Sequence, residues 1–153
     1  MREWNGAVTD RSPADVINKT PKAYLKPGDL NRIEENIAYL SERINAQSYD
    51  IRPIPPKNWV QDNVPETNDI KRICDSILAI AQAYYIPEGY VDLSSLRHKA
   101  LHFSDVNDIE RNLAGIHELL ISGVVYGYLK SYTYGAIKTY TYKYLRTTET
   151  QSL

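Results

Sequence analysis

The sequence predicts a mainly α fold, in which a bundle of three repeated helices is followed by a Tyr-rich tail of short strands. A nine-residue motif recurs three times, each copy opens a stripe of apolar residues, and the end of the chain repeats with a period of eight. A chain of 153 residues is expected to form one compact domain with an appendage. We expect an N-terminal arm with a short helix at 1–28, a three-helix repeat domain at 29–121 and the tail at 122–153.

The composition is that of an ordinary globular protein. The chain is 42% hydrophobic and 24% charged with a net charge of -1, so no charge excess indicates nucleic acid or an anionic membrane as partner. Its single cysteine, Cys74, excludes an internal disulfide. The first residues lack the apolar region of a secretory signal, and no apolar run is long enough to span a bilayer. We expect a soluble protein that is not secreted by a signal peptide.

The N-terminal arm contains the start signal of a short helix. Ser12 is a suitable N-cap, Pro13 suits the first helical position, and Asp15 suits the third. Pro21 and Pro27 should end or exclude helix before the first repeat.

The repeated motif begins at Asp29, Asp69 and Asp105. The shared pattern is Asp-[Leu/Ile/Val]-x-x-Ile-x-x-[Asn/Ser]-[Ile/Leu]. The first and third copies lie 76 residues apart, and both also have Asn in the third place, Glu in the sixth and Asn in the eighth. We interpret the three copies as three versions of one helical unit.

Each copy continues as an apolar stripe that steps by three and four residues, which is the pattern of an amphipathic helix. We expect helices at about 29–46, 68–85 and 104–121, with Gly28, Asn68 and Ser104 as N-caps. The stripes either pack against one another within the chain or face other chains, and both alternatives remain open. Their members are Leu30, Ile33, Ile37, Leu40, Ile44; Ile70, Ile73, Ile77, Ile80, Tyr84; Val106, Ile109, Leu113, Ile116, Leu120.

Two long connections join the repeats. The first, 49–67, contains Pro-Ile-Pro-Pro, which favours extended polyproline geometry. We expect Trp59 and Val60 to anchor it onto the bundle. A connection of this length in a small domain often has a binding role. The second, 86–103, contains a turn at Pro87-Glu88-Gly89.

Polar residues beside the stripes recur between the copies. Asn36, Ser76 and Asn112 share the eighth place, where we expect them to hydrogen-bond a loop backbone and set how each helix joins the next. Glu34 and Glu110 share the sixth place, which we interpret as the solvated flank of a helix. Cys74 is expected to be a small, partly buried apolar residue.

The sequence contains no catalytic signature, such as a phosphate-binding Gly-rich loop, His-Glu-x-x-His or Gly-x-Ser-x-Gly. His98 and His102 are four residues apart, but a metal site made from them lacks a third ligand, and His117 stands alone. We therefore predict no catalytic residue, no cofactor and no metal, and we expect that the protein is not an enzyme.

The tail is made of octads. Residues 131–138 and 139–146 share the pattern [Ser/Thr]-Tyr-Thr-Tyr-x-x-[Ile/Leu]-[Lys/Arg], and 123–130 matches from its Tyr onward. Tyr-Thr-Tyr favours β-structure, so we expect short strands separated by turns near Gly127, Gly135 and Lys143. Between 121 and 146 the tail has four basic residues and no acidic one.

Tyr side chains with basic neighbours suit packing between subunits, and they also suit stacking on sugars or on nucleic-acid bases. We favour an interface between subunits, keep glycan contact as an alternative, and consider nucleic acid the weaker candidate. The predicted partner-binding residues are Tyr126, Tyr128, Tyr132, Tyr134, Tyr140, Tyr142, Tyr144 and Trp59.

Several segments resemble small virion proteins of bacteriophages and prophages. They are Trp4-Asn5-Gly6 with Thr9-Asp10-Arg11-Ser12, the segment Leu25 to Leu40 with Asp29-Leu30-Asn31-Arg32-Ile33-Glu34, the stretch Asn58-Trp59 through Ile73, and the octads. The segment Leu25 to Leu40 is similar to a motif of tail- and baseplate-region proteins of phages that infect Gram-positive bacteria. The resemblance implies a virion component and carries over no catalytic residue.

Together these features predict a non-enzymatic structural or adaptor protein of a phage tail or phage-tail-like particle, assembled in the host bacterial cytoplasm. Its partners would be other virion proteins and further copies of itself, without a membrane. The alternative is a module of a tail tip that binds a glycan or another part of the host surface.

Overall fold

The computed structural model describes residues 1–52 and 54–122, apart from the side chains of residues 97 and 98. This part of the chain is mainly helical and contains no strand, which confirms the predicted helical class. The Tyr-rich tail and its predicted strands lie outside the described residues. Residues Met1–His117 form one compact unit, and α4 continues beyond them to Ser122. The elements are α1 (Pro13–Ile17), η1 (Pro21–Ala23), α2 (Pro27–Asn45), α3 (Thr67–Ala83), η2 (Ser94–His98) and α4 (Phe103–Ser122).

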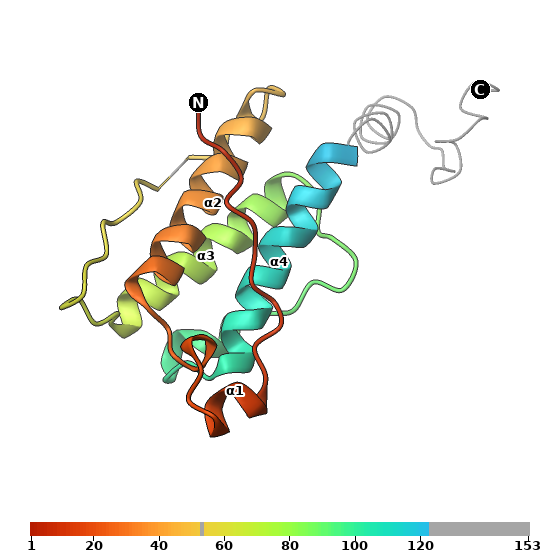
Figure 1. Cartoon of the computed structure of the whole chain (residues 1–153). Coiled ribbons are helices and arrows are strands. Elements are labelled where there is room, and N and C mark those ends of the chain that lie inside the picture. Colours follow the sequence, from red (N-terminus) through yellow and green to blue (C-terminus); the bar gives the residue numbers. More distant parts are fainter. Residues whose placement is uncertain (53, 123–153) are drawn as a thin grey trace. The chain divides into compact units, whose positions relative to one another are not determined.

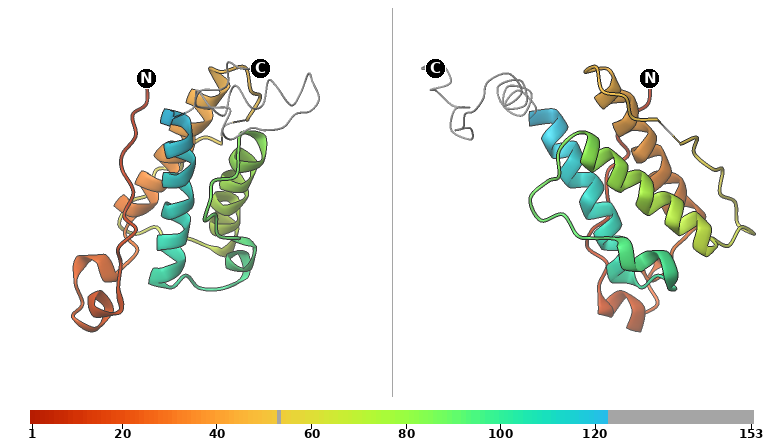
Figure 2. Two further views of the ribbon diagram at one scale, coloured as in Figure 1. Left: turned by 90° about the vertical axis from the view of Figure 1, so that its right-hand side faces the viewer. Right: turned by 180° about the vertical axis from the view of Figure 1, so that it is seen from behind.

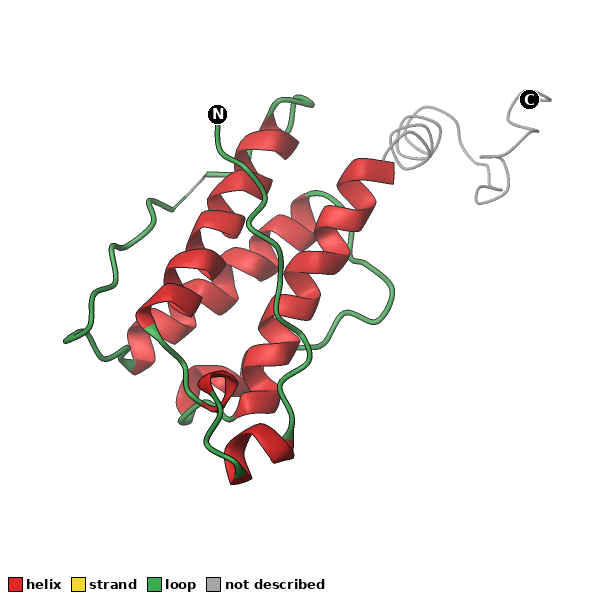
Figure 3. Ribbon diagram, viewed as in Figure 1, coloured by secondary structure: helices red, strands yellow, loops and turns green. Residues whose placement is uncertain are grey.

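The three repeat helices α2, α3 and α4 run in the same direction and start at the same end of the bundle (Figure 1). A helix of this size is about 25–30 Å long. After α2 and after α3 the chain must therefore return along the bundle, which takes at least about eight extended residues. The connection 46–66 and the connection 84–102, which includes η2, make these returns (Figure 3). The parallel arrangement therefore requires a long connection after α2 and after α3.

Three extended segments lie along the helices, and we call them straps. The N-terminal strap, residues 4–11, passes in front of α2 and α4 (Figures 1 and 2). The first return strap, residues 54–60, hydrogen-bonds to α2, and the second, residues 86–92, hydrogen-bonds to α4. The second connection approaches α4 so closely that a Cβ on Gly115 would lie 3.0 Å from the Pro87 ring.

The core is formed by the apolar stripes of the three repeats. Because these side chains are buried by residues of the same chain, the stripes pack within the chain and do not face other copies. The buried members are Leu30, Ile33, Ile37, Leu40, Ile44, Ile70, Ile73, Ile77, Ile80, Tyr84, Val106, Ile109, Leu113 and Ile116. No helix in residues 1–52 and 54–122 is long and apolar enough to cross a membrane.

The helix starts differ from the prediction. The helices begin two residues earlier than N-caps at Gly28, Asn68 and Ser104 imply, because the motif's Asp occupies the third helical position. Its carboxylate accepts a hydrogen bond from the backbone N–H just before the helix, which satisfies a donor that the helix leaves free. The three bonds join Lys26 N to Asp29 (3.0 Å), Glu66 N to Asp69 (3.1 Å) and His102 N to Asp105 (2.8 Å).

The short helix α1 begins as predicted. The Ser12 side chain accepts a hydrogen bond from the Asp15 backbone N–H, and the Asp15 carboxylate accepts one from Ser12 N at 2.9 Å. The hydroxyls of Thr20 and Ser12 also donate to this carboxylate and lower the pKa of Asp15 below its ordinary value. These bonds tie α1 to the residues that follow it.

Replacement of the capping carboxylate should destabilise the bundle. We expect Asp105→Ala to lower the free energy of unfolding by about 0.5–2 kcal/mol, because the His102 N–H loses its acceptor and the helix end its negative charge. Urea unfolding measures the change. The matched control is Asp108→Ala on the same helix, which removes only a surface pair with Arg111 and should cost less than about 1 kcal/mol. Equal losses for both variants would refute this role of Asp105.

Candidate functional site

Five asparagine side chains hold extended backbone against the helices. At Asn107, for example, Oδ1 accepts from Arg11 N at 3.1 Å and Nδ2 donates to the same residue's carbonyl at 2.8 Å. An amide matches a peptide group in this way because it offers one acceptor beside a donor. The other four pairs are Asn31 with Trp59, Asn36 with Asn5 and Gly6, Asn45 with Ile51, and Asn112 with Val91.

These contacts confirm that Asn36 and Asn112 hydrogen-bond a loop backbone, but only Asn112 binds a connection between two repeat helices, since Asn36 binds the N-terminal strap. The prediction for Ser76 is wrong, since its hydroxyl donates to the Arg72 carbonyl of its own helix at 2.6 Å. A hydroxyl on one carbon is too short to make the paired contact that an amide makes. The matching role of Asn31 and Asn107 was not predicted, although their recurrence in the third place of two copies was visible in the sequence.

A buried charged cluster fastens the N-terminal strap. Glu110, with 0% exposure, accepts from Arg32 Nε at 3.0 Å, Arg32 Nη2 at 2.7 Å, Arg11 Nη2 at 2.8 Å and Val8 N at 2.9 Å. Asp29 also accepts from both guanidinium groups, at 2.8 Å from Arg32 and 3.2 Å from Arg11. Two cations and two carboxylates from the strap, α2 and α4 therefore meet in one cluster.

A second cluster fastens the first return strap. Glu34 accepts from both terminal nitrogens of Arg72, from Trp59 Nε1 at 2.7 Å and from Lys57 N at 2.8 Å. Trp59 has only 2% of its surface exposed, which confirms it as the anchor of this connection and leaves it little surface for a partner. Val60, the other predicted anchor, is 50% exposed and does not bury its side chain.

Both glutamates contradict the prediction of a solvated flank, since Glu34 is 3% and Glu110 0% exposed. A buried carboxylate is tolerated when cations and N–H donors replace its water. Each of these two accepts four hydrogen bonds, which is about the full acceptor capacity of a carboxylate. Neither has a lone pair left for a substrate.

Two further charged groups have shifted pKa values. Burial alone would lower the pKa of Arg32, but its hydrogen bonds and ion pairs with Glu110 and Asp29 raise it above the ordinary value. Burial would raise the pKa of Asp69, yet the bond from Lys57 Nζ at 2.7 Å and that from the Glu66 backbone lower it. Both groups are therefore held in their charged forms at neutral pH.

Two Arg–Glu pairs link the three copies, and they occupy two of the three junctions of a cycle. In each pair the Arg comes from the fourth place of the motif and the Glu from the sixth. Arg32 of the first copy reaches Glu110 of the third, and Arg72 of the second reaches Glu34 of the first. At the third junction the fourth place of the third copy is Asp108 and the sixth place of the second copy is Cys74. These residues replace the Arg and the Glu, so no Arg–Glu pair forms there.

The asparagine contacts follow the same cycle. The N-terminal strap is held by the eighth place of the first copy, Asn36, and the third place of the third copy, Asn107. The first return strap has only the third-place contact of Asn31, and the second only the eighth-place contact of Asn112. The bundle therefore approximates a threefold arrangement in which the N-terminal strap is the most completely fastened.

His117, His102 and Cys74 have different surroundings. His117 stacks on Trp4 with ring centres 4.2 Å apart, and the His102 ring lies 3.2 Å from the Ser104 hydroxyl. Cys74 is 1% exposed, which confirms it as a small apolar residue of the core. In the part of the chain that the structure describes, no group of three or more His, Cys, Asp or Glu could hold a metal ion. The side chain of His98 and the seven predicted tyrosines lie outside the described residues.

Comparison of the chain with protein-family profiles, with curated proteins and with solved structures gives no match.

Loss of an asparagine contact should loosen its strap. We expect Asn36→Ala to lower the free energy of unfolding by about 1–3 kcal/mol, because Asn5 N and the Gly6 carbonyl lose their partners. Hydrogen exchange should also accelerate at the N-terminal strap. Ser76→Ala is the matched control at the same place of the motif, and it should leave exchange in every strap unchanged because Ser76 binds only its own helix. Unchanged hydrogen exchange at Asn5 in Asn36→Ala would show that the Asn36 side chain does not hold the N-terminal strap.

Removal of the buried charge of Glu110 should be more damaging. Glu110→Gln leaves two guanidinium groups sharing Asp29 alone, so we expect a loss of about 3–5 kcal/mol in the free energy of unfolding. The control Glu35→Gln neutralises an exposed carboxylate paired with Arg2, worth less than about 1 kcal/mol. Chemical denaturation of the two variants measures both values, and similar small losses would show that the cluster contributes little.

Proposed function

We propose that this chain is a non-enzymatic structural or adaptor protein of a phage tail or phage-tail-like particle. It would join further copies of itself and other virion proteins, and it would assemble in the host bacterial cytoplasm. The observation that carries the proposal is the saturation of Glu34 and Glu110, whose acceptor positions are occupied by groups of the same chain. Catalysis needs polar groups that converge on a free space, and these converge on one another.

The fastened straps support an architectural role. Paired amide contacts and charged clusters fix segments that would otherwise be loops, so residues 1–117 present one defined arrangement of helices and straps. A rigid helical domain followed by a binding segment suits a protein that must hold that segment in place. The appended sequence follows α4 in the chain and has Tyr-rich octads, whose residues are typical of interfaces.

The assignment to a virion rests on the resemblance of the motif segment, Leu25 to Leu40, and of the octads to phage tail- and baseplate-region proteins. Assembly around a particle axis requires contacts between identical copies, and interfaces of this kind repeat with the symmetry of the particle. The Tyr residues of the octads are the proposed contact residues, with Tyr132, Tyr134, Tyr140 and Tyr142 in the two most similar octads.

Light scattering tests the proposal by comparing the intact protein with a version that ends at Ser122. We expect the intact protein to be multimeric and the shortened one to be monomeric. Circular dichroism should show that the shortened protein keeps its helices. Particles assembled with the shortened protein should be defective. An intact protein that stays monomeric, together with normal particles after removal of the tail, would refute the proposal.

A glycan array distinguishes the alternative. Binding of a host-surface glycan that disappears when the four octad tyrosines are changed to serine, without any change in assembly, would favour a tail-tip recognition module instead.

A further inference from the structure

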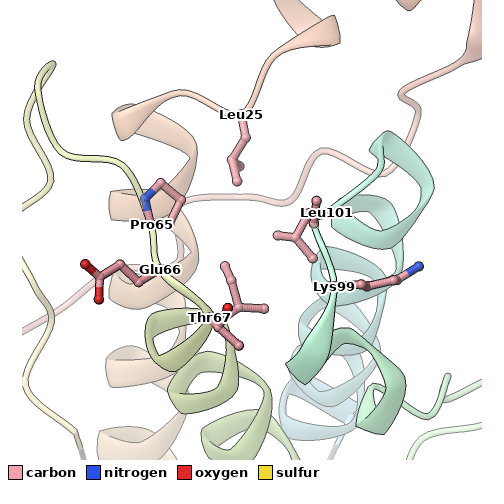
Figure 4. Close-up of a pocket in the computed structure, with 8 residues that line it drawn as sticks. Leu25, Pro65, Glu66, Thr67, Lys99 and Leu101 are labelled. Atoms are coloured by element: carbon pink, nitrogen blue, oxygen red, sulfur yellow. The ribbon is translucent and has the colours of Figure 1, made fainter.

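A cavity opens at the end of the bundle where the three repeat helices start (Figure 4). Its volume is about 570 Å³. Three of its lining residues, Leu25, Pro65 and Leu101, stand four residues before the Asp of their own motif copy. They occupy the same place in the three copies, just before the residue that precedes each helix. The cavity therefore lies where the three copies meet.

The neighbourhood of the cavity is apolar and exposed. Tyr24, next to Leu25, is 54% exposed, and Val64, next to Pro65, is 80% exposed. An apolar hollow with exposed apolar side chains beside it is typical of a surface that another segment covers. The charged lining residues are Lys99, which is paired with Asp105 at 3.0 Å, and the exposed Glu66.

We propose that this cavity binds the octad segment, residues 131–146, of a neighbouring copy of the chain. This inference rests on the proposed function and names the surface that receives the tail. Each octad combines a Tyr-Thr-Tyr trio with an aliphatic residue, Ile137 or Leu145, which suits an apolar hollow. The aliphatic residue is followed at once by Lys138 or Arg146, which complements the exposed carboxylate of Glu66.

The proposed function, in which copies of the chain join one another, makes a neighbour the donor of the octad segment. A neighbour's tail in the cavity would make a head-to-tail contact, which closes into a ring or continues as a stack. Both products suit a particle built around an axis.

Binding of a fluorescent peptide with the sequence of residues 131–146 to the full chain tests the proposal, with anisotropy as the readout. Two variants alter the cavity: Thr67→Trp fills it from an exposed position, and Leu101→Asp makes it polar. The matched control is Ile86→Asp, which changes an aliphatic residue of 59% exposure outside the lining. We expect peptide affinity to fall at least tenfold in both cavity variants and to stay unchanged in the control, with all three retaining the parent circular dichroism spectrum.

Light scattering of the same full-length variants gives the second readout, and Thr67→Trp should reduce the mass of the multimer. Equal peptide affinity in all variants, or none in the parent, overturns the proposal. A monomeric parent whose tail becomes more sensitive to protease in Thr67→Trp also overturns it, since the cavity would then hold the chain's own tail. If changing the octad tyrosines to serine abolishes the multimer while Thr67→Trp retains it, only the role of this cavity is rejected. The proposed function would then still stand.

Discussion

The parallel course of α2, α3 and α4 is the constraint on which the rest of the structure depends. Parallel neighbours require the chain to return along the bundle, and within residues 1–52 and 54–122 the returning backbone has no strand beside it to pair with. The helices meet this requirement with side chains. Asparagine amides imitate the edge of a peptide group, and Glu34 and Glu110 accept further strap N–H groups. The straps are thereby held without a sheet.

The two Arg–Glu pairs determine which helix face meets which. A buried ion pair often adds little net stability, because desolvation of the charges offsets their attraction. It does make wrong arrangements costly, since a misplaced Glu110 or Arg32 would be buried without its partner. The third junction of the cycle has Cys74 and Asp108 in place of the pair. In this arrangement the pairs fix the order of the helices, and burial of the stripes supplies most of the stability.

Much of the fold could be predicted from spacing alone. Steps of three and four residues located all three repeat helices, because a stripe buried on one face leaves that period in the sequence whatever packs against it. The burial of Glu34 and Glu110 could not be found in this way. A carboxylate beside a stripe has the same local sequence whether water or an arginine faces it, and Arg72 and Arg32 come from other copies of the motif. The helix starts were misplaced because Asp caps from the third helical position, which depends on the turn before it.

The repeat itself explains why Asn and Glu side chains of the described helices hold the straps in place. A motif copied along one chain places the same Asn and Glu at successive junctions, where each copy meets a strap and a neighbouring Arg. The donors that converge on Glu110 also occupy the positions from which a substrate could approach. Chemical specificity must then come from surfaces that the junctions leave uncovered. The cavity at the start of the helices is such a surface, since it is lined by the apolar residues that stand before each copy.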